Sequence, residues 1–108
     1  MAALLVITHL PDATRAETLA SLLIEARVAA CVNILAPCRS VYRWEGKLEH
    51  ADEVPLLIKT TAARYDALEA AIRQHHPYEL PEIIAVPIER GLPDYLDWVD
   101  AETSTHGL

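Results

Sequence analysis

The chain has 108 residues, of which 52% are hydrophobic and 23% are charged, and this composition predicts one compact domain rather than a disordered segment. The formal net charge of −7 argues against nucleic-acid binding, because phosphates require clustered Lys and Arg. The apolar stretch 2–8 is far shorter than the roughly 18 residues of a membrane span and carries no signal-peptide pattern, so we expect a cytoplasmic protein without a membrane partner.

The first predicted elements are a buried strand and an amphipathic helix. Residues 4–7 form a short apolar run of the kind found in buried strands. Asp12 or Thr14 can cap the helix that follows, and Thr14 with Glu17 fits a capping box. An apolar stripe then continues at helical spacing through Ala16, Leu19, Leu22, Leu23 and Ala26.

A long β-hairpin is predicted around the pair Glu45-Gly46, because glycine adopts the positive φ of a tight turn at little steric cost. Its arms run from Cys31 to Trp44 and on to Ile58, whereas strands usually have about five or six residues. A hairpin of this length outgrows the sheet of so small a domain and leaves backbone groups that another chain must cover or pair. The sequence therefore predicts an oligomer assembled through its hairpins.

Two prolines interrupt the arms of this hairpin. Pro37 cannot donate to the ladder, so we expect a bulge or bend in the first arm. Pro55 predicts an outward-facing or irregular pairing in the second arm. Cys31 and Cys38 lie on the same extended arm, about 20 Å apart if fully extended, so we expect two free, half-buried thiols.

The second half of the chain predicts a helix, a strand and another helix. Residues 64–76 read as a helix that Pro77 ends, and residues 83–88 read as a strand. Pro93 suits the first turn of a short third helix, and the tail from Ala101 is expected to fray. The order βαββαβ plus a helix predicts a ferredoxin-like α+β sandwich in one domain over 1–108, with both internal helices on one face of an antiparallel sheet.

Catalysis has little support in the sequence. None of the serines sits in a nucleophile-elbow pattern, and three glycines do not make a phosphate-cradling loop. We therefore predict no catalytic residue and no residue that binds an organic cofactor.

His75 and His76 are the candidate metal ligands, because imidazole suits copper, nickel and zinc. Adjacent residues on a helix point about 100° apart, so the pair cannot chelate one ion unless the helix unwinds before Pro77. Otherwise another loop or subunit must supply ligands. The alternative is structural, since a histidine in the last turn interacts favourably with the helix dipole.

Several motifs follow one another in order over roughly residues 3–100. They are Ala-Ala-Cys-Val-Asn-Ile at 29–34, Trp-Glu-Gly-Lys at 44–47, Glu-Val at 53–54 with Ile-Lys-Thr at 58–60, His-Pro-Tyr-Glu at 76–79 with Pro-Glu-Ile-Ile at 81–84, and Pro-Asp-Tyr-Leu at 93–96 with Trp98. Together they resemble the CutA family of divalent-cation tolerance proteins. The resemblance implies a ferredoxin-like subunit in a homotrimer whose hairpins pair between subunits, and a cytosolic role in copper tolerance and copper binding.

The resemblance also bears on the metal ligands. In some members a cysteine at the end of the first strand is proposed to join the histidine pair, and here that position is Thr8. A hydroxyl is a poor copper ligand compared with a thiolate, so the third ligand is not identified. The neighbouring His9 would normally point to the opposite side of the strand.

The remaining matched positions with polar chemistry suggest a cleft formed by Trp44, Glu45, Lys59, Tyr78 and Glu82. Such a cleft would bind a small anion or a metal complex. The alternative is a structural ion pair between Lys59 and Glu82, with aromatic side chains at a subunit interface. Two functions stay open: a copper-binding trimer in divalent-cation tolerance, and a trimeric structural or signalling scaffold that binds a small ligand or partner between subunits.

Overall fold

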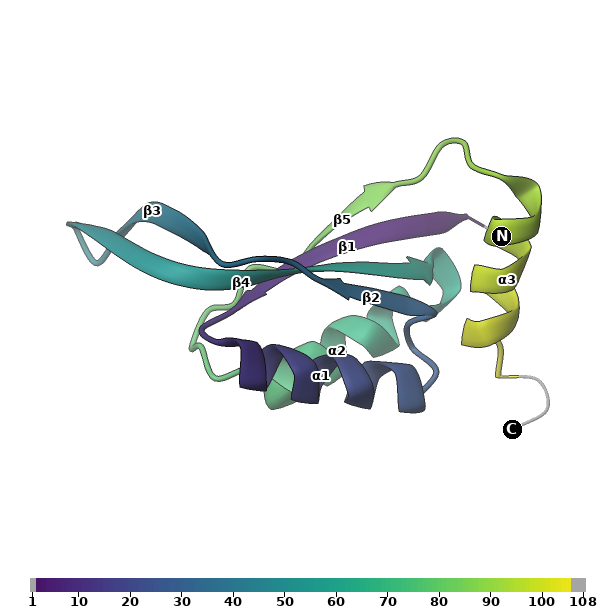
Figure 1. Ribbon diagram of the computed structural model, residues 1–108, viewed down its shortest axis with the longest axis horizontal. Coiled ribbons are helices and arrows are strands. Elements are labelled where there is room, and N and C mark those ends of the chain that lie inside the picture. The colour runs from purple at the N-terminus through teal and green to yellow at the C-terminus, as the bar shows by residue number, and fades with distance from the viewer. Residues whose placement is uncertain (1, 106–108) are drawn as a thin grey trace.

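A β-sheet with two helices packed on one of its faces forms the body of the structure, a computed structural model that describes residues 2–105 (Figure 1). The elements are β1 (Ala3–Leu10), α1 (Ala13–Glu25), β2 (Cys31–Ile34), β3 (Cys38–Trp44), β4 (Lys47–Thr61), a 3-10 turn (Ala62–Arg64), α2 (Tyr65–His75), β5 (Ile84–Pro87) and α3 (Pro93–Thr103). β2 and β3 are two parts of one hairpin arm that both pair with β4, so the order confirms the predicted ferredoxin-like βαββαβ pattern with an additional C-terminal helix.

Strand β4 is the centre of the sheet. It pairs with β1 along one side and with β2 and then β3 along the other, and β5 pairs with the free side of β1. All of these pairings are antiparallel. Side chains alternate between the two faces, so Val6 and Leu56 face the helices while His9 and Pro55 face away from them.

The hydrophobic core lies between the sheet and the two helices α1 and α2. Its largest fully buried side chains are Val6, Leu10, Leu23, Leu56, Ile58, Leu68 and Ile72. The stripe predicted for the first helix is confirmed, because Ala16, Leu19 and Leu23 are buried against the sheet. Burial of these apolar surfaces is the main term that holds the two layers together.

The predicted hairpin turn is confirmed at Glu45 and Gly46, which have φ values of 49° and 79°. Two successive residues with positive φ make the tight turn that matches the twist of the flanking strands. β3 and the first half of β4 project beyond the helices (Figure 1). Large apolar side chains are exposed on this projection, including Val41 (59%) and Leu48 (68%).

The predicted bulge in the first arm is present before and at Pro37. Ile34 pairs with Leu56 and Cys38 pairs with Glu53, so three residues on one arm oppose two on the other. Pro55 itself pairs in register with His9, and its carbonyl accepts a hydrogen bond from the Leu35 N–H at 3.0 Å. Pro55 therefore pairs regularly with β1. Its backbone nitrogen, which carries no hydrogen, points toward the first arm of the hairpin, and the irregular pairing predicted at Pro55 occurs on that side.

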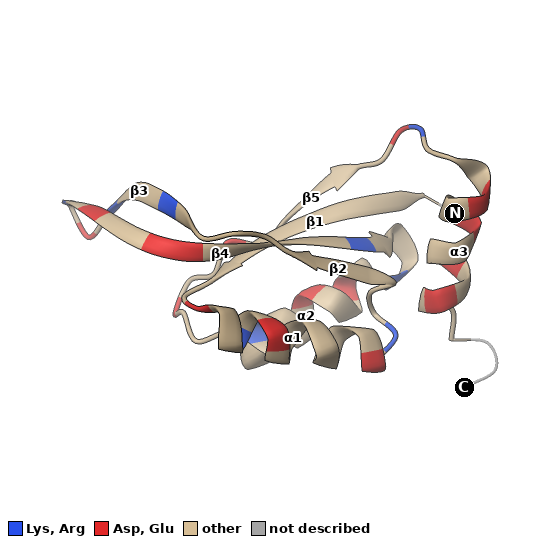
Figure 2. Ribbon diagram, in the orientation of Figure 1, with Lys and Arg blue, Asp and Glu red and all other residues tan. Residues whose placement is uncertain are grey.

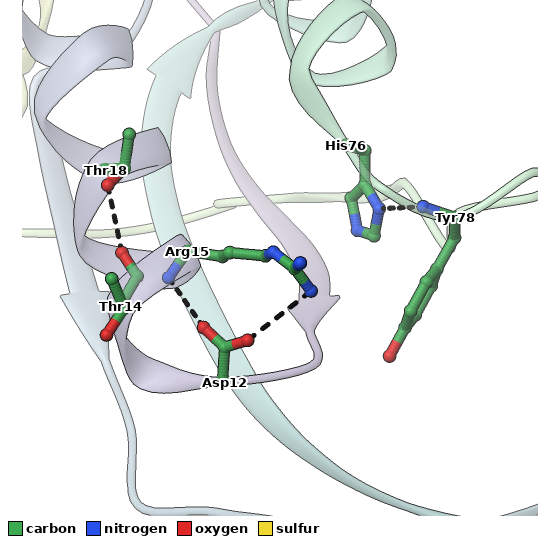
Figure 3. Close-up of polar contacts among 6 residues, drawn as sticks. All are labelled: Asp12, Thr14, Arg15, Thr18, His76 and Tyr78. Carbon is green, nitrogen blue, oxygen red and sulfur yellow. Dashed lines mark hydrogen bonds and ion pairs between the residues drawn. The ribbon is translucent and has the colours of Figure 1, made fainter.

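The capping box predicted for Thr14 and Glu17 is wrong, because a Thr14 cap would start the helix at residue 15, whereas α1 begins two residues earlier, at Ala13. Asp12 is the N-cap: its extended backbone lets Oδ1 accept the Arg15 N–H at 2.8 Å (Figure 3). Thr14 lies within the first turn, where its carbonyl accepts the Thr18 hydroxyl at 3.0 Å. Asp12 was the other residue that the sequence proposed for this cap.

The fraying predicted from Ala101 is also wrong, since α3 continues to Thr103. Thr103 is buried, and its hydroxyl donates to the Val99 carbonyl at 2.9 Å. The guanidinium of Arg27 donates to the carbonyls of Ala101 (3.0 Å) and Ser104 (3.1 Å). A side chain distant in sequence therefore caps this helix, and periodicity alone cannot reveal such a cap. Residues 106–108 of the predicted tail lie outside the described residues.

Two further expectations concern the cysteines and the helices. Cys31 and Cys38 are both free thiols, as predicted, and both are half-buried. Across residues 2–105, the helices are all too short or too polar to cross a lipid bilayer.

The N-cap gives a test of the fold. We expect Asp12→Ala to lower the free energy of unfolding by about 1 kcal/mol, because the Arg15 N–H loses its acceptor. Asp12→Asn keeps a side-chain oxygen at the same place and should retain most of the stability. Urea unfolding followed by circular dichroism measures both, and equal losses in the two variants would contradict the assignment of the cap.

Candidate functional site at the base of the hairpin

A pocket of about 810 Å³ lies where the hairpin leaves the sandwich. Three elements form it: the end of β1, the hairpin formed by β3 and β4, and the loop that connects α2 to β5. His9, Trp44, Glu53, Tyr78 and Glu82 are among its lining residues. We refer to it below as the hairpin pocket.

The local sequence explains why the loop reaches this place. Pro77 prevents α2 from continuing, and His76 adopts an extended backbone with φ −80° and ψ 135°. The chain then crosses the end of β1 before it enters β5, which pairs with β1. Tyr78 and Glu82 are thereby brought beside His9, although about 70 residues separate them in sequence.

His76 holds this loop to β1 through both of its ring nitrogens. Nε2 donates to the His9 carbonyl at 2.7 Å. Nδ1 accepts the backbone N–H of Tyr78 at 3.1 Å (Figure 3). A carbonyl only accepts and an N–H only donates, so this geometry fixes the neutral tautomer with its proton on Nε2. His76 is 8% exposed, and the Tyr78 ring packs against it with 4.8 Å between the ring centroids.

The environment of His76 opposes its protonation. Burial lowers the pKa of His76 below its ordinary value of 6.5, while the His9 carbonyl and the charge of Glu53 act in the opposite direction with less effect. Protonation would also place a hydrogen on Nδ1, where the Tyr78 N–H already points. The neutral imidazole is therefore part of the folded structure.

The two histidines predicted to bind metal occupy different environments. His75 is exposed at the last residue of α2, whereas His76 is buried and fully hydrogen-bonded. The structure does not bring them together as a chelate, and His76 would have to give up a hydrogen bond to coordinate an ion. Within residues 2–105, moreover, no three His, Cys, Asp or Glu side chains are grouped so as to hold a metal ion.

Thr8 and His9 point to opposite sides of β1, as strand geometry predicts. Thr8 is completely buried toward the helices, and its hydroxyl oxygen lacks a hydrogen-bond partner among the described residues. His9 faces the hairpin pocket, and its Nδ1 lies 3.4 Å from Oε1 of Glu82. This Nδ1 is likewise buried and without a hydrogen-bond partner in the part of the chain described.

The ion pair proposed from the sequence between Lys59 and Glu82 is wrong. Lys59 donates instead to the side-chain oxygen of Asn33 and to the sulfur of Cys31, at 3.9 Å in the latter case. Both partners lie on β2, which pairs directly with the Lys59 end of β4. Cross-strand neighbours thus satisfy the ammonium, and Glu82 lies beside His9 in a different part of the fold.

Of the five residues predicted to form a cleft, three line the hairpin pocket: Trp44, Tyr78 and Glu82. Glu45 lies in the hairpin turn and Lys59 lies further along the sheet, so neither lines it. Glu53 was missed. Its carboxylate and burial together raise the pKa of Tyr78 to about 12, with burial the larger cause. Strand alternation could have indicated Glu53, because it is two residues from Pro55 on β4 and both side chains lie on the face that carries His9.

The chemistry of the hairpin pocket favours cations. Carboxylates of Glu53, Glu79 and Glu82 line it together with one imidazole, and Arg43 supplies a positive charge. Acidic residues recur along the hairpin and on the helices, with basic residues interspersed (Figure 2). Imidazole and carboxylate groups together make donors suited to divalent transition metals.

Comparison with known proteins gives a consistent result. The model of a family described as CutA1 divalent ion tolerance protein matches residues 4–102. The Divalent-cation tolerance protein CutA of Pectobacterium atrosepticum is 43% identical over 99 residues, which cover 92% of this chain and 90% of that protein. The Protein CutA homolog of Xenopus laevis is 47% identical over 89 residues, 82% of this chain and 59% of that protein.

Solved structures show the same fold. CutA from Xylella fastidiosa superposes with a TM-score of 0.92 at 42% identity, over 94% of this chain and 98% of that one. CutA1 from Oryza sativa superposes with a TM-score of 0.94 at 37% identity, over 97% and 96% of the two chains.

The bonds of His76 predict how stability depends on pH. Because its pKa is lowered in the folded state, the unfolded chain binds more protons below pH 6.5, so the free energy of unfolding should fall as the pH drops through that value. His76→Gln removes this titration and should cost about 1–3 kcal/mol at pH 8, since a Gln amide that replaces Nε2 at the His9 carbonyl leaves no acceptor at the position of Nδ1 for the Tyr78 N–H. The exposed His75→Gln serves as the control. Urea unfolding between pH 5 and 8 compares them, and an unchanged slope in His76→Gln would contradict the role given to His76.

Proposed function

The chain belongs to the CutA1 divalent ion tolerance family, and from that premise we propose that it is a cytoplasmic homotrimer that binds copper(II) or a similar divalent ion. The relatives are named for divalent-cation tolerance, which supports the general role. The acidic, imidazole-bearing hairpin pocket is the observation in this chain that carries the cation-binding part of the proposal.

The hairpin supports assembly into an oligomer. In residues 2–105, β3 pairs with β4 alone, so its other edge offers unpaired backbone groups. Val41, Tyr42, Trp44 and Leu48 remain exposed on the same hairpin. A second copy that covers these side chains and pairs with the free edge would remove both features at once. The homotrimer itself comes from the family resemblance.

The accessible imidazole of His75 supports copper binding near the end of α2. Copper(II) has the highest affinity of the divalent first-row ions at nitrogen donors. His75 is exposed, and His76 next to it holds the loop in place through its hydrogen bonds. We therefore assign His75 as the accessible metal ligand of the predicted pair. His76 becomes a ligand only if it gives up one of its two hydrogen bonds.

The free thiols of Cys31 and Cys38 accord with a reducing compartment, which supports the cytoplasmic part of the proposal.

A second function, ligand or partner binding between subunits, is favoured by the size of the hairpin pocket. At about 810 Å³ it falls within the range of small-molecule sites, roughly 300–1,000 Å³. Trp44 and Tyr78 give it aromatic walls. In this case the trimer is a scaffold, and its metal affinity is incidental.

The role of the hairpin in assembly can be tested by truncating Trp44. Aromatic side chains at the centre of an interface often contribute about 2 kcal/mol or more, so Trp44→Ala should weaken the trimer. Ile24→Ala is a matched control, because Ile24 on α1 is 39% exposed and Trp44 is 38% exposed. Light scattering at low micromolar concentration reports the assembly. A Trp44→Ala protein that remains fully trimeric would place the interface elsewhere.

Copper binding is tested by calorimetric titration in a weakly competing buffer. We expect one saturable copper(II) site per subunit that is lost in His75→Gln and kept in His50→Gln, which removes another exposed imidazole, on the hairpin. Because the His75 side chain is exposed, its replacement should leave the fold intact, and circular dichroism checks this. Binding that survives the loss of His75 would demote copper to an incidental ligand and favour the scaffold.

A further inference from the structure

His9 presents a buried ring nitrogen, Nδ1, that has no hydrogen-bond partner among the described residues. Its Nδ1 accepts and donates no hydrogen bond within residues 2–105, although the atom is shielded from water. An unsatisfied buried nitrogen costs free energy, and coordination of a metal ion by its lone pair would remove that cost. The group that faces this nitrogen is the carboxylate of Glu82, with Oε1 at 3.4 Å.

This separation has the value expected for two ligands of one tetrahedral metal ion. Zinc binds imidazole nitrogen at about 2.0–2.1 Å and carboxylate oxygen at about 2.0–2.2 Å, which places two such donors about 3.4 Å apart at a tetrahedral angle. We propose that Nδ1 of His9 and the carboxylate of Glu82 bind one divalent transition-metal ion of the zinc type in the wall of the hairpin pocket, with water in the remaining positions.

The fold prepares the two ligands differently. His9 is held firmly, because its backbone pairs with Pro55 of β4 and its carbonyl accepts the Nε2–H of His76. Its side chain is only 18% exposed, whereas that of Glu82 is 47% exposed and can adjust to an incoming ion. Across residues 2–105, Lys and Arg nitrogens all lie beyond 4.0 Å of this carboxylate. A rigid donor and an adjustable donor together make a preorganised but accessible site.

The donor set selects the class of ion. Calcium and magnesium prefer six or more oxygen ligands, and the imidazole nitrogen of His9 does not suit them. Imidazole with carboxylate suits zinc, copper and nickel, and the 3.4 Å separation is compatible with a tetrahedral ion such as zinc. Glu53 and Glu79 line the same pocket and add negative charge that favours a cation. With two protein ligands the ion exchanges readily, unlike one in a closed structural site.

The biological meaning of this site rests on the proposed function. The site adds to that function two named ligands and a class of metal ion for the hairpin pocket. Its donors, His9 and Glu82, line the hairpin pocket, whereas the exposed His75 proposed as a copper ligand is not among the lining residues. The role of His76 is then indirect, since its hydrogen bond fixes the backbone of His9.

Calorimetric titration of the full-length protein with zinc chloride at pH 7.5 tests the site. We expect one saturable site per chain, with affinity reduced at least about tenfold in His9→Gln, because losing even an outer-shell partner of a metal ligand typically costs about 10- to 100-fold. Glu82→Gln, an isosteric change at an exposed position, should also weaken binding. Glu82→Asp should retain part of the affinity. His50→Gln is the matched control and should bind as the unaltered protein does.

The outcomes separate this inference from the proposed function. Wild-type zinc affinity in both His9→Gln and Glu82→Gln, with circular dichroism and light scattering unchanged, would overturn the site. If zinc binding disappears in His75→Gln instead, the inference fails while the proposed function stands. If none of these variants changes a weak, unsaturable signal, both the site and specific divalent-ion binding fail. Loss in the His9 and Glu82 variants alone, with His75→Gln unaffected, supports the site.

Discussion

The fifteen-residue strand β4 is the constraint on which the rest of the structure depends. Its C-terminal half lies at the centre of the sheet, where Val54, Leu56 and Ile58 close the core against the helices. Its N-terminal half leaves the sandwich as one arm of the hairpin. Because the strand is continuous, the core fixes the direction of the hairpin, and the hairpin pocket forms beside the point where the two halves meet.

The hairpin pocket depends equally on a neutral histidine. His76 joins the end of α2 to the end of β1, and in doing so it holds Tyr78 and Glu82 beside His9. His76 is therefore structural, His75 is exposed to solvent, and His9 faces a carboxylate from a largely buried position. His75 and His76, which are adjacent in the sequence, thus have different roles, because one is exposed and the other is buried and hydrogen-bonded.

The features predicted correctly from the sequence are those that short local patterns determine. Gly46 indicated the turn, Pro37 indicated the bulge, Pro77 indicated the end of α2, and apolar periodicity indicated the buried face of α1. The predictions failed for interactions whose partner residue is distant in the chain. Arg27 caps α3, and Asn33 and Cys31 satisfy Lys59, across separations that no short pattern encodes. For the same reason the pairing of His9 with Glu82 could not be predicted.

The extra residue in the first arm of the hairpin also decides the composition of the hairpin pocket. On β2, even-numbered residues such as Val32 lie on the helix-facing side, because Val32 pairs with Ile58. The inserted residue reverses this parity on β3, where Tyr42 pairs with Glu49 and Trp44 with Lys47. The two aromatic side chains therefore lie on the same side of the ribbon as His9 and Glu53. Without the extra residue, Tyr42 and Trp44 would lie on the other side of the ribbon. One inserted residue therefore places both aromatic side chains on the side of the hairpin that faces the pocket.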